Sequence, residues 1–225
     1  MKNKSIFISR KISSDSPFNG LSQEYDVKII DEPLIKITQV SFSYTPQTQW
    51  VFFSSKNAIK YFFAQNPDLS GNTKYAVISI ASANYLKQFD KVASFVGEGV
   101  DLTVIAKKFR DVLQNDSVLF PQAMDSLQTI QKQLSFTNIT YNLYTYKTVI
   151  KTDIDLPYAD VVIFTSPSNV DSYFKKYRTD VRQLVIAMGY STKHKLVGYG
   201  VKNVLTPNSF SEDGLLALLT SENGF

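Results

Sequence analysis

The sequence predicts an α/β protein built from two parallel-sheet domains that are joined by a two-stranded connector. Three observations lead to this fold class. Short apolar runs alternate with longer amphipathic stretches, two segments alternate apolar and polar residues, and one short unit is repeated. The 225 residues are enough for one large core or two smaller ones.

The short apolar runs are typical of buried strands, and the stretches between them have helical periodicity. The predicted strands are Ile6–Ser9, Val27–Ile30, Trp50–Phe53, Ala76–Ile80, Val92–Val96, Val118–Phe120, Val161–Phe164, Leu184–Met188 and Asn203–Leu205. The predicted helices are Lys56–Gln65, Ala83–Phe89, Leu102–Leu113, Met124–Leu134, Asn169–Tyr177, Thr192–Gly198 and Ser211–Leu219. Such alternation of strand and helix favours parallel sheets.

Two segments differ from the buried runs, because Leu34–Val40 and Tyr141–Ile150 alternate apolar and polar residues as half-exposed strands do. They bracket a central block of about a hundred residues. We therefore expect a discontinuous domain 1, made of residues 1–36 and 148–225, and an inserted domain 2 of residues 37–147. Each domain is expected to be flavodoxin-like or Rossmann-like, and the paired connectors are suited to act as a hinge.

A short internal repeat supports two related domains. Val51–Ile59 resembles Val162–Val170, since each has a buried strand, then hydroxyl residues, then the start of an amphipathic helix. A repeated unit of this kind favours an origin by duplication.

Composition excludes several kinds of chemistry. The chain has no cysteine, so disulfides, thiolate nucleophiles and Cys-ligated metals are excluded. It has one histidine, His194, which leaves little material for His-based metal sites or a Ser-His triad. Gly97-Glu98-Gly99 lacks the third glycine of the dinucleotide fingerprint, and no Walker A sequence occurs. A Rossmann cofactor is therefore not favoured.

Charge and hydropathy point to an anionic small molecule. The net charge is +4, with basic residues scattered along the chain, so neither nucleic acid nor a membrane surface is favoured as partner. No run of eighteen apolar residues is present, and the apolar stretch Ile6–Ile8 is too short for a signal peptide. A cytoplasmic location is expected.

Several predicted strands end in small hydroxyl residues and turn into a helix. This occurs at Ser9, Ser54-Ser55, Ser82, Thr165–Ser168 and Gly189–Thr192. Helix N-termini offer free N–H groups to anions, and ligands of open α/β sheets bind at the carboxyl edge of the strands. Two domains that face each other with such edges would line a cleft for an anion. For any single residue an ordinary N-cap is the favoured role, whereas the number of these residues and their shared edge favour ligand binding by the group.

A series of landmarks along the chain is similar to the uroporphyrinogen-III synthase family. In order, these are Ile6–Arg10, Asp31–Leu34, Trp50–Ile59, Val118–Ala123, Tyr146–Thr148, Asp160–Val170 and Ala187–Thr192, followed by Leu196, Gly198 and Pro207. The resemblance covers nearly the whole chain. Two departures are that Ile80–Asn84 lacks the Gly and Thr often found there, and that Ser191 stands where Thr is common.

The resemblance implies a reaction on hydroxymethylbilane, a linear tetrapyrrole with eight carboxylates. The enzyme would remove its hydroxyl as water, close the ring and invert the terminal pyrrole through a spiro intermediate, without a metal or organic cofactor and as a monomer. By the same resemblance Tyr146 is the candidate general acid, and packing on a connector strand is its alternative role. The candidate substrate-binding residues are Arg10, Ser54, Ser55, Ser82, Thr165, Ser166, Ser168, Ser191 and Thr192.

Two other functions remain open from the sequence. One is a non-catalytic cytoplasmic two-lobed protein that closes on an anionic small molecule. The other is a flavodoxin-like phosphate-binding enzyme such as a sugar-phosphate isomerase, which would need a clearer acid–base pair than the sequence offers.

Overall fold

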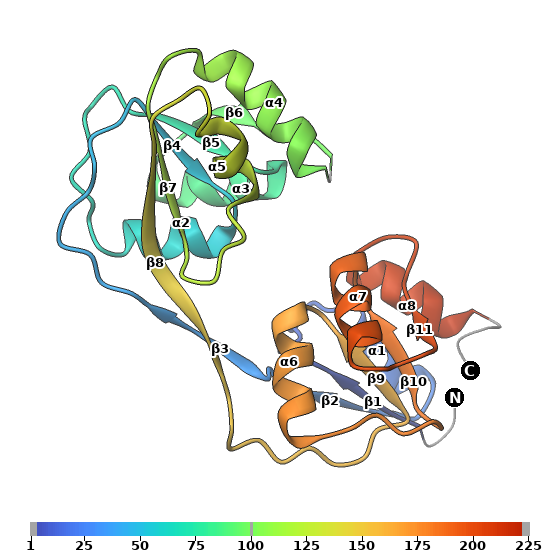
Figure 1. The fold of residues 1–225 in the computed structure, drawn as a ribbon. Helices are drawn as coiled ribbons and strands as arrows, with labels where there is room; N and C mark the ends of the chain where they lie inside the picture. The colour runs from blue at the N-terminus through green and yellow to red at the C-terminus, as the bar shows by residue number, and fades with distance from the viewer. Residues whose placement is uncertain (1–3, 100, 222–225) are drawn as a thin grey trace. The chain divides into compact units, whose positions relative to one another are not determined.

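The structure is a computed structural model that describes residues 4–99 and 101–221. The chain divides into two compact units, Met1–Lys36 with Val149–Phe225 (unit 1) and Ile37–Thr148 (unit 2) (Figure 1). Each unit consists of a mostly parallel sheet with helices on both faces. The predicted α/β class with two parallel sheets is therefore confirmed.

Unit 1 contains a five-stranded sheet in the order β11-β10-β9-β1-β2. Its strands are β1 (Lys4–Ile8), β2 (Val27–Asp31), β9 (Val161–Phe164), β10 (Leu184–Ala187) and β11 (Val204–Leu205). All neighbouring strands pair in parallel. When the strands of this unit are numbered along the chain and read from β2 to β11, the order is 2-1-3-4-5, which is the flavodoxin-like arrangement.

Four helices cover the two faces of this sheet: α1 (Phe18–Glu24), α6 (Pro167–Lys176), α7 (Tyr190–Gly198) and α8 (Glu212–Thr220). On one face Phe7 and Phe164 pack with Val170 of α6 and Leu196 of α7. On the other face the strands pack against α1 and α8. Burying each such large apolar side chain contributes about 1.5–3 kcal/mol to folding.

The second sheet has six strands in the order β3-β8-β7-β4-β5-β6. It lies in unit 2 except for the first two residues of β3 and the last two of β8, which belong to unit 1. Its strands are β3 (Ile35–Gln39), β4 (Trp50–Phe53), β5 (Lys74–Val77), β6 (Ala93–Val96), β7 (Val118–Ala123) and β8 (Thr140–Ile150). When β3 is left out and the other five strands are numbered along the chain and read from β6 to β8, the order is 3-2-1-4-5, which is Rossmann-like. At the edge, Val40 N–H donates to Thr145 O and Lys151 N–H to Leu34 O, so β3 runs antiparallel to β8.

The helices of unit 2 are α2 (Lys56–Phe63), α3 (Ile80–Leu86), a 3₁₀ turn η1 (Lys87–Phe89), α4 (Leu102–Leu113) and α5 (Thr129–Leu134). α4 and α5 cover one face, where Phe52 packs against Phe109 and Phe120 with ring centroids 5.0 and 5.4 Å away. α2 and α3 cover the other face. The sheet is thus buried on both sides, as parallel sheets usually are.

The structure differs from the predicted elements in several places. The strand predicted at Ala76–Ile80 ends at Val77, and α3 begins at Ile80 instead of Ala83. The reason is that Ser79 Oγ accepts a hydrogen bond from Ser82 N–H and caps the helix early. The strand at Val118 continues to Ala123, so the helix predicted from Met124 is shortened to α5.

Two elements have a role that the periodicity did not indicate. α1 was not predicted at all. β8 was expected to be a connector, but it is also a strand of the unit 2 sheet that pairs in parallel with β7 along Val118–Ala123.

Among residues 4–99 and 101–221, no helix is long and apolar enough to cross a membrane.

Candidate active site

Each sheet has one topological switch point, where the strand order reverses direction. In unit 1 it lies between β1 and β9, and in unit 2 between β4 and β7. Ligands of open α/β sheets bind beyond the carboxyl ends of the strands at such points. Ser9 and Thr165 follow the two strands of the first switch point, and Ser54 and Ser55 follow β4 at the second. Three of the predicted binding residues, Thr165, Ser54 and Ser55, therefore lie where this architecture places ligands.

The first switch point is organised by a buried serine. Ser9 has no exposed surface, and its backbone N–H donates to Ile163 O at 3.0 Å. Its Oγ accepts a hydrogen bond from Thr165 N–H at 2.9 Å and lies 3.2 Å from Thr165 Oγ1. The ends of β1 and β9 are thereby joined through side chains as well as through the sheet.

Asn169 connects these hydroxyl groups to the first connector. Its side chain is almost fully buried, and its Nδ2 donates to Ser166 Oγ at 2.9 Å and to Thr165 Oγ1 at 3.3 Å. Its Oδ1 accepts from Leu34 N–H at 3.3 Å. Ser166 is also the N-cap of α6, because its Oγ accepts from Asn169 N–H. The hydroxyls of Thr165 and Ser166 thus have fixed orientations.

The other predicted residues of unit 1 on helices lie outside this network. Ser168 is the second residue of α6 and is half-buried. α7 begins at Tyr190 with Gly189 as N-cap, so Ser191 and Thr192 occupy its first turn instead of preceding it. Ser191 is exposed, whereas Thr192 is buried. Ser191 therefore has the freer hydroxyl of the two.

Arg10 follows β1 and Ser9, but its guanidinium is bound to a carboxylate of the same unit. Arg10 Nη2 donates to Glu212 Oε1 at the start of α8. Glu212 Oε2 in turn accepts from Ser16 Oγ at 2.7 Å. Neither Glu212 nor Ser16 was singled out in the sequence, because no local pattern links either residue to Arg10.

In unit 2 the structure brings together two of the predicted residues, Ser55 and Tyr146. Ser55 is the N-cap of α2, and its Oγ accepts from Ala58 N–H at 3.0 Å. The same Oγ lies 3.0 Å from the phenol oxygen of Tyr146, in a hydrogen bond between residues 91 positions apart. Ser54, the preceding residue, is half-buried. The candidate general acid therefore lies at the start of α2, at the second switch point.

An irregularity in β8 places Tyr146 at this point. Gln122 of β7 is paired with Tyr144, but Ala123 is paired with Tyr146, so Thr145 is an extra residue. A bulge of this kind changes the direction of the following side chain. Thr145 is fully buried, and Tyr146 retains 9% exposure. The Tyr61 ring stacks on the Tyr146 ring at a centroid distance of 5.7 Å and restricts its position further.

The environment of Tyr146 keeps its phenol protonated. Burial raises the pKa of Tyr146 above the usual value for tyrosine, the hydrogen bond from Ser55 lowers it, and the negative charge of Asp125 raises it again. The net effect is a raised pKa, so the phenol stays protonated at neutral pH. Asp125 follows β7 and was not predicted to influence the site.

Ser82 lies inside α3 instead of before it. It is the third residue of that helix and is 3% exposed, and its Oγ is 3.3 Å from Ser79 Oγ. Ser79, not Ser82, lies between β5 and α3, where we expected a ligand-binding hydroxyl. Sequence reasoning missed Ser79 because the predicted strand continued through it.

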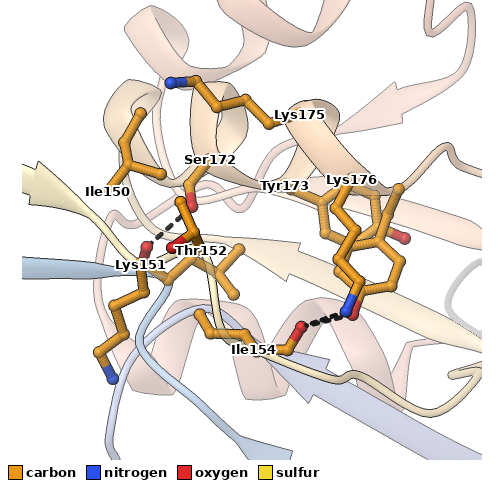
Figure 2. A pocket seen from close by; sticks show the side chains of 10 residues that line it. Ile150, Lys151, Thr152, Ile154, Ser172, Tyr173, Lys175 and Lys176 are labelled. Atoms are coloured by element: carbon orange, nitrogen blue, oxygen red, sulfur yellow. Dashed lines mark hydrogen bonds between the residues drawn. The ribbon is translucent and has the colours of Figure 1, made fainter.

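Unit 1 also contains a cavity of about 240 Å³ beside α6, lined by the residues drawn in Figure 2. None of the predicted site residues lines it. Lys176 Nζ and the Tyr177 phenol both donate to Ile154 O, at 2.7 and 2.9 Å. Tyr177 also accepts from Leu156 N–H at 2.9 Å. These contacts attach the segment after β8 to α6, so we assign them a structural role.

The fold and these residues define a two-sheet α/β protein with a buried phenol and a set of hydroxyl groups at its switch points. A family model described as uroporphyrinogen-III synthase HemD matches residues 16–221. The chain therefore belongs to the uroporphyrinogen-III synthase family. Its members are cyclising lyases of tetrapyrrole, or haem, biosynthesis.

Solved structures show the same fold. The uroporphyrinogen-III synthetase from Helicobacter pylori 26695 superposes with a TM-score of 0.72 at 17% identity, over 96% of this chain and 97% of that chain. A mutant uroporphyrinogen III synthase from the extremely thermophilic bacterium Thermus thermophilus gives a TM-score of 0.62 at 14% identity, over 96% and 97% of the two chains. No curated protein matches the chain by sequence.

Proposed function

We propose that this chain converts hydroxymethylbilane to uroporphyrinogen III with Tyr146 as the general acid. Membership of the family supports the reaction. The observation that carries the residue assignment is the hydrogen bond of Tyr146 to Ser55 at the second switch point. A protonated phenol at this point is a suitable donor to a leaving hydroxyl.

The reaction requires little from the protein beyond a proton and correct positioning. The pyrrole rings of the substrate are electron-rich, so the attacking carbon is part of the substrate. Transfer of the Tyr146 proton to the substrate hydroxyl lets the C–O bond break with loss of water. Holding the chain in a folded conformation then determines which carbon of the terminal ring attacks, and this is mainly a matter of proximity and orientation.

Ser55 has a second role in this scheme. When Tyr146 gives up its proton, the phenolate oxygen needs a hydrogen-bond donor in a site from which most water is excluded. The Ser55 hydroxyl is 3.0 Å away and can supply that bond. Hydrogen bonds to a charged oxygen are stronger than those between neutral groups, so Ser55 favours the proton transfer.

The substrate carboxylates are bound by helix N-termini, hydroxyl groups and one guanidinium. α2, α6 and α7 each start just after a strand and present free N–H groups there. The residues proposed to add side-chain contacts are Arg10, Ser54, Ser55, Ser82, Thr165, Ser166, Ser168, Ser191 and Thr192. Because Ser82 and Thr192 are both buried, their proposed contributions are the smallest of the set.

We further propose that residues 1–36 and 148–225 form domain 1, that residues 37–147 form domain 2, and that the enzyme acts as a cytoplasmic monomer. Its substrate is a tetrapyrrole rather than nucleic acid or membrane lipid, and no metal or organic cofactor takes part. Sedimentation of the purified chain at micromolar concentration tests the oligomeric state, and a dimer would contradict it.

The reaction is tested by the isomer of the product. Purified protein is incubated with freshly generated hydroxymethylbilane, and the products are oxidised and separated by chromatography. Closure without an enzyme gives the symmetric type I ring, so an excess of type III is the expected result. Folded protein that binds the substrate and yields only type I would instead be the non-catalytic binder.

A further inference from the structure

Arg10 is held by the protein itself before any substrate arrives. Its Nη2 donates to Glu212 Oε1, and its side chain is 35% exposed. Its Nε is buried and has no hydrogen-bond partner within the part of the chain that the structure describes. The guanidinium is thus fixed on one side, and part of the Arg10 side chain remains exposed at the carboxyl edge of the unit 1 sheet.

Glu212 is itself held in place. It is the first residue of α8, where the helix dipole favours a negative charge, and Ser211 caps the same helix end through Gly214 N–H. Its Oε2 accepts from Ser16 Oγ at 2.7 Å. Ser16 is 5% exposed, and its Oγ also accepts from Phe18 N–H. Both carboxylate oxygens of Glu212 are therefore engaged.

We propose that Glu212 is a positioning residue for Arg10, and that Ser16 holds Glu212 for this purpose. This inference rests on the proposed function, in which Arg10 binds a carboxylate of the substrate. An arginine has five N–H donors in a planar fork, so a bond to Glu212 on one side leaves donors on the other side for a ligand. A fixed guanidinium loses less conformational freedom on binding than a mobile one.

The sign of the effect separates positioning from simple electrostatics. Glu212 carries a negative charge close to a site for an anionic substrate. If the charge acted only through space, its removal would strengthen substrate binding. If Glu212 positions Arg10, its removal weakens binding although a repulsive charge has been lost. The two explanations predict opposite changes in KM.

Asp213 provides a matched control. It is the next residue in the first turn of α8, is exposed, and contributes the same charge to the helix N-terminus. Glu212→Gln and Asp213→Asn each remove one negative charge and keep the size of the side chain. Glu212 contacts Arg10 and Ser16, so a difference between the two variants reports on those contacts.

The experiment measures kcat and KM for formation of type III product, using freshly made hydroxymethylbilane, together with thermal stability of each variant. Glu212→Gln is expected to raise KM roughly tenfold and to change kcat less than about twofold, because binding is lost equally from ground and transition states. Asp213→Asn is expected to leave KM unchanged or lower it. Ser16→Ala, which keeps the Glu212 charge, is expected to raise KM in the same direction.

A double-mutant comparison tests whether Glu212 acts through Arg10. In an Arg10→Ala background, Glu212→Gln is expected to have no further effect on KM. An unchanged or lowered KM in the single Glu212→Gln variant would overturn the inference, as would an equal rise of KM in the presence and absence of Arg10. Wild-type protein that yields only type I ring would overturn the proposed function as well, so the two failures are distinguishable.

Discussion

The phenol oxygen of Tyr146 lies 3.0 Å from Ser55 Oγ, and this hydrogen bond joins strand β8 to the start of α2. The bulge at Thr145 and the stacking ring of Tyr61 hold the phenol in place. The buried phenol hydroxyl has its hydrogen-bond partner at the switch point, where ligands of open α/β sheets bind.

Removal of the Tyr146 hydroxyl should affect catalysis more than folding. Tyr146→Phe is expected to lower kcat about 100-fold, the usual contribution of a positioned general acid, with little change in KM. Loss of one hydrogen bond should lower the free energy of unfolding by about 1 kcal/mol. Tyr144→Phe, on the same strand and 40% exposed, is the control and should retain full activity. Unchanged turnover of Tyr146→Phe would exclude Tyr146 from the mechanism but not the chain from its family.

Ser55→Ala removes both the N-cap of α2 and the partner of Tyr146. We expect unfolding free energy, measured by urea titration, to fall by about 1–2 kcal/mol, and kcat to fall as well. Ser54→Ala leaves the cap intact and should be less destabilising. Equal stability losses in the two variants would contradict the assigned cap.

The charge of Asp125 should be detectable in the titration of Tyr146. Because that negative charge raises the pKa of the phenol, Asp125→Asn is expected to lower the pKa of Tyr146. The ultraviolet absorbance change with pH, corrected by subtracting the Tyr146→Phe variant, measures this value. Asp111→Asn changes the net charge equally on the exposed surface of α4 and should leave the titration unchanged. Identical Tyr146 titration curves for Asp125→Asn and Asp111→Asn would contradict the assigned effect of Asp125 on the pKa of Tyr146.

Asp160 should contribute stability that depends on pH. Its carboxylate accepts from Ser5 N–H and Ser5 Oγ, both at 2.8 Å, and these bonds lower the pKa of Asp160. A lowered folded-state pKa gives stability that is present above the unfolded value of about 4 and is lost as pH falls through the folded value.

Asp160→Asn should therefore lower the free energy of unfolding at neutral pH by about 1 kcal/mol and weaken its decline in acid. Urea titrations at neutral and acidic pH measure both effects. Asp153→Asn, at an exposed position, is the control. A wild-type acid profile retained in Asp160→Asn would show that another group causes the decline.

The alternation of strands and helices made most of the fold predictable, since buried parallel strands and amphipathic helices leave separate patterns. α1 was missed because it is short and has few buried apolar residues, chiefly Phe18 and Leu21. The start of α3 was misplaced because Ala76–Ile80 is apolar except at Ser79 and therefore resembles a buried strand. Only the cap at Ser79 shows where the chain turns.

The strand-then-hydroxyl pattern indicated Ser55, Thr165 and Ser166, because caps after parallel strands leave a local signal. Glu212, Asp125 and Asn169 left no such signal. Glu212 lies 202 positions from Arg10, and their contact depends on how α8 packs beside β1 in the folded unit. Patterns in one sequence describe local structure, so contacts between residues this far apart can be identified only from the folded structure.

The most direct test of the central claim compares product isomers from wild-type protein and Tyr146→Phe under identical conditions. Both proteins are given fresh hydroxymethylbilane, and the type III to type I ratio is followed over time. We expect mainly type III from the wild type and a shift toward type I in the variant, because slow catalysis lets spontaneous closure compete. Type I alone from folded wild-type protein would contradict the account.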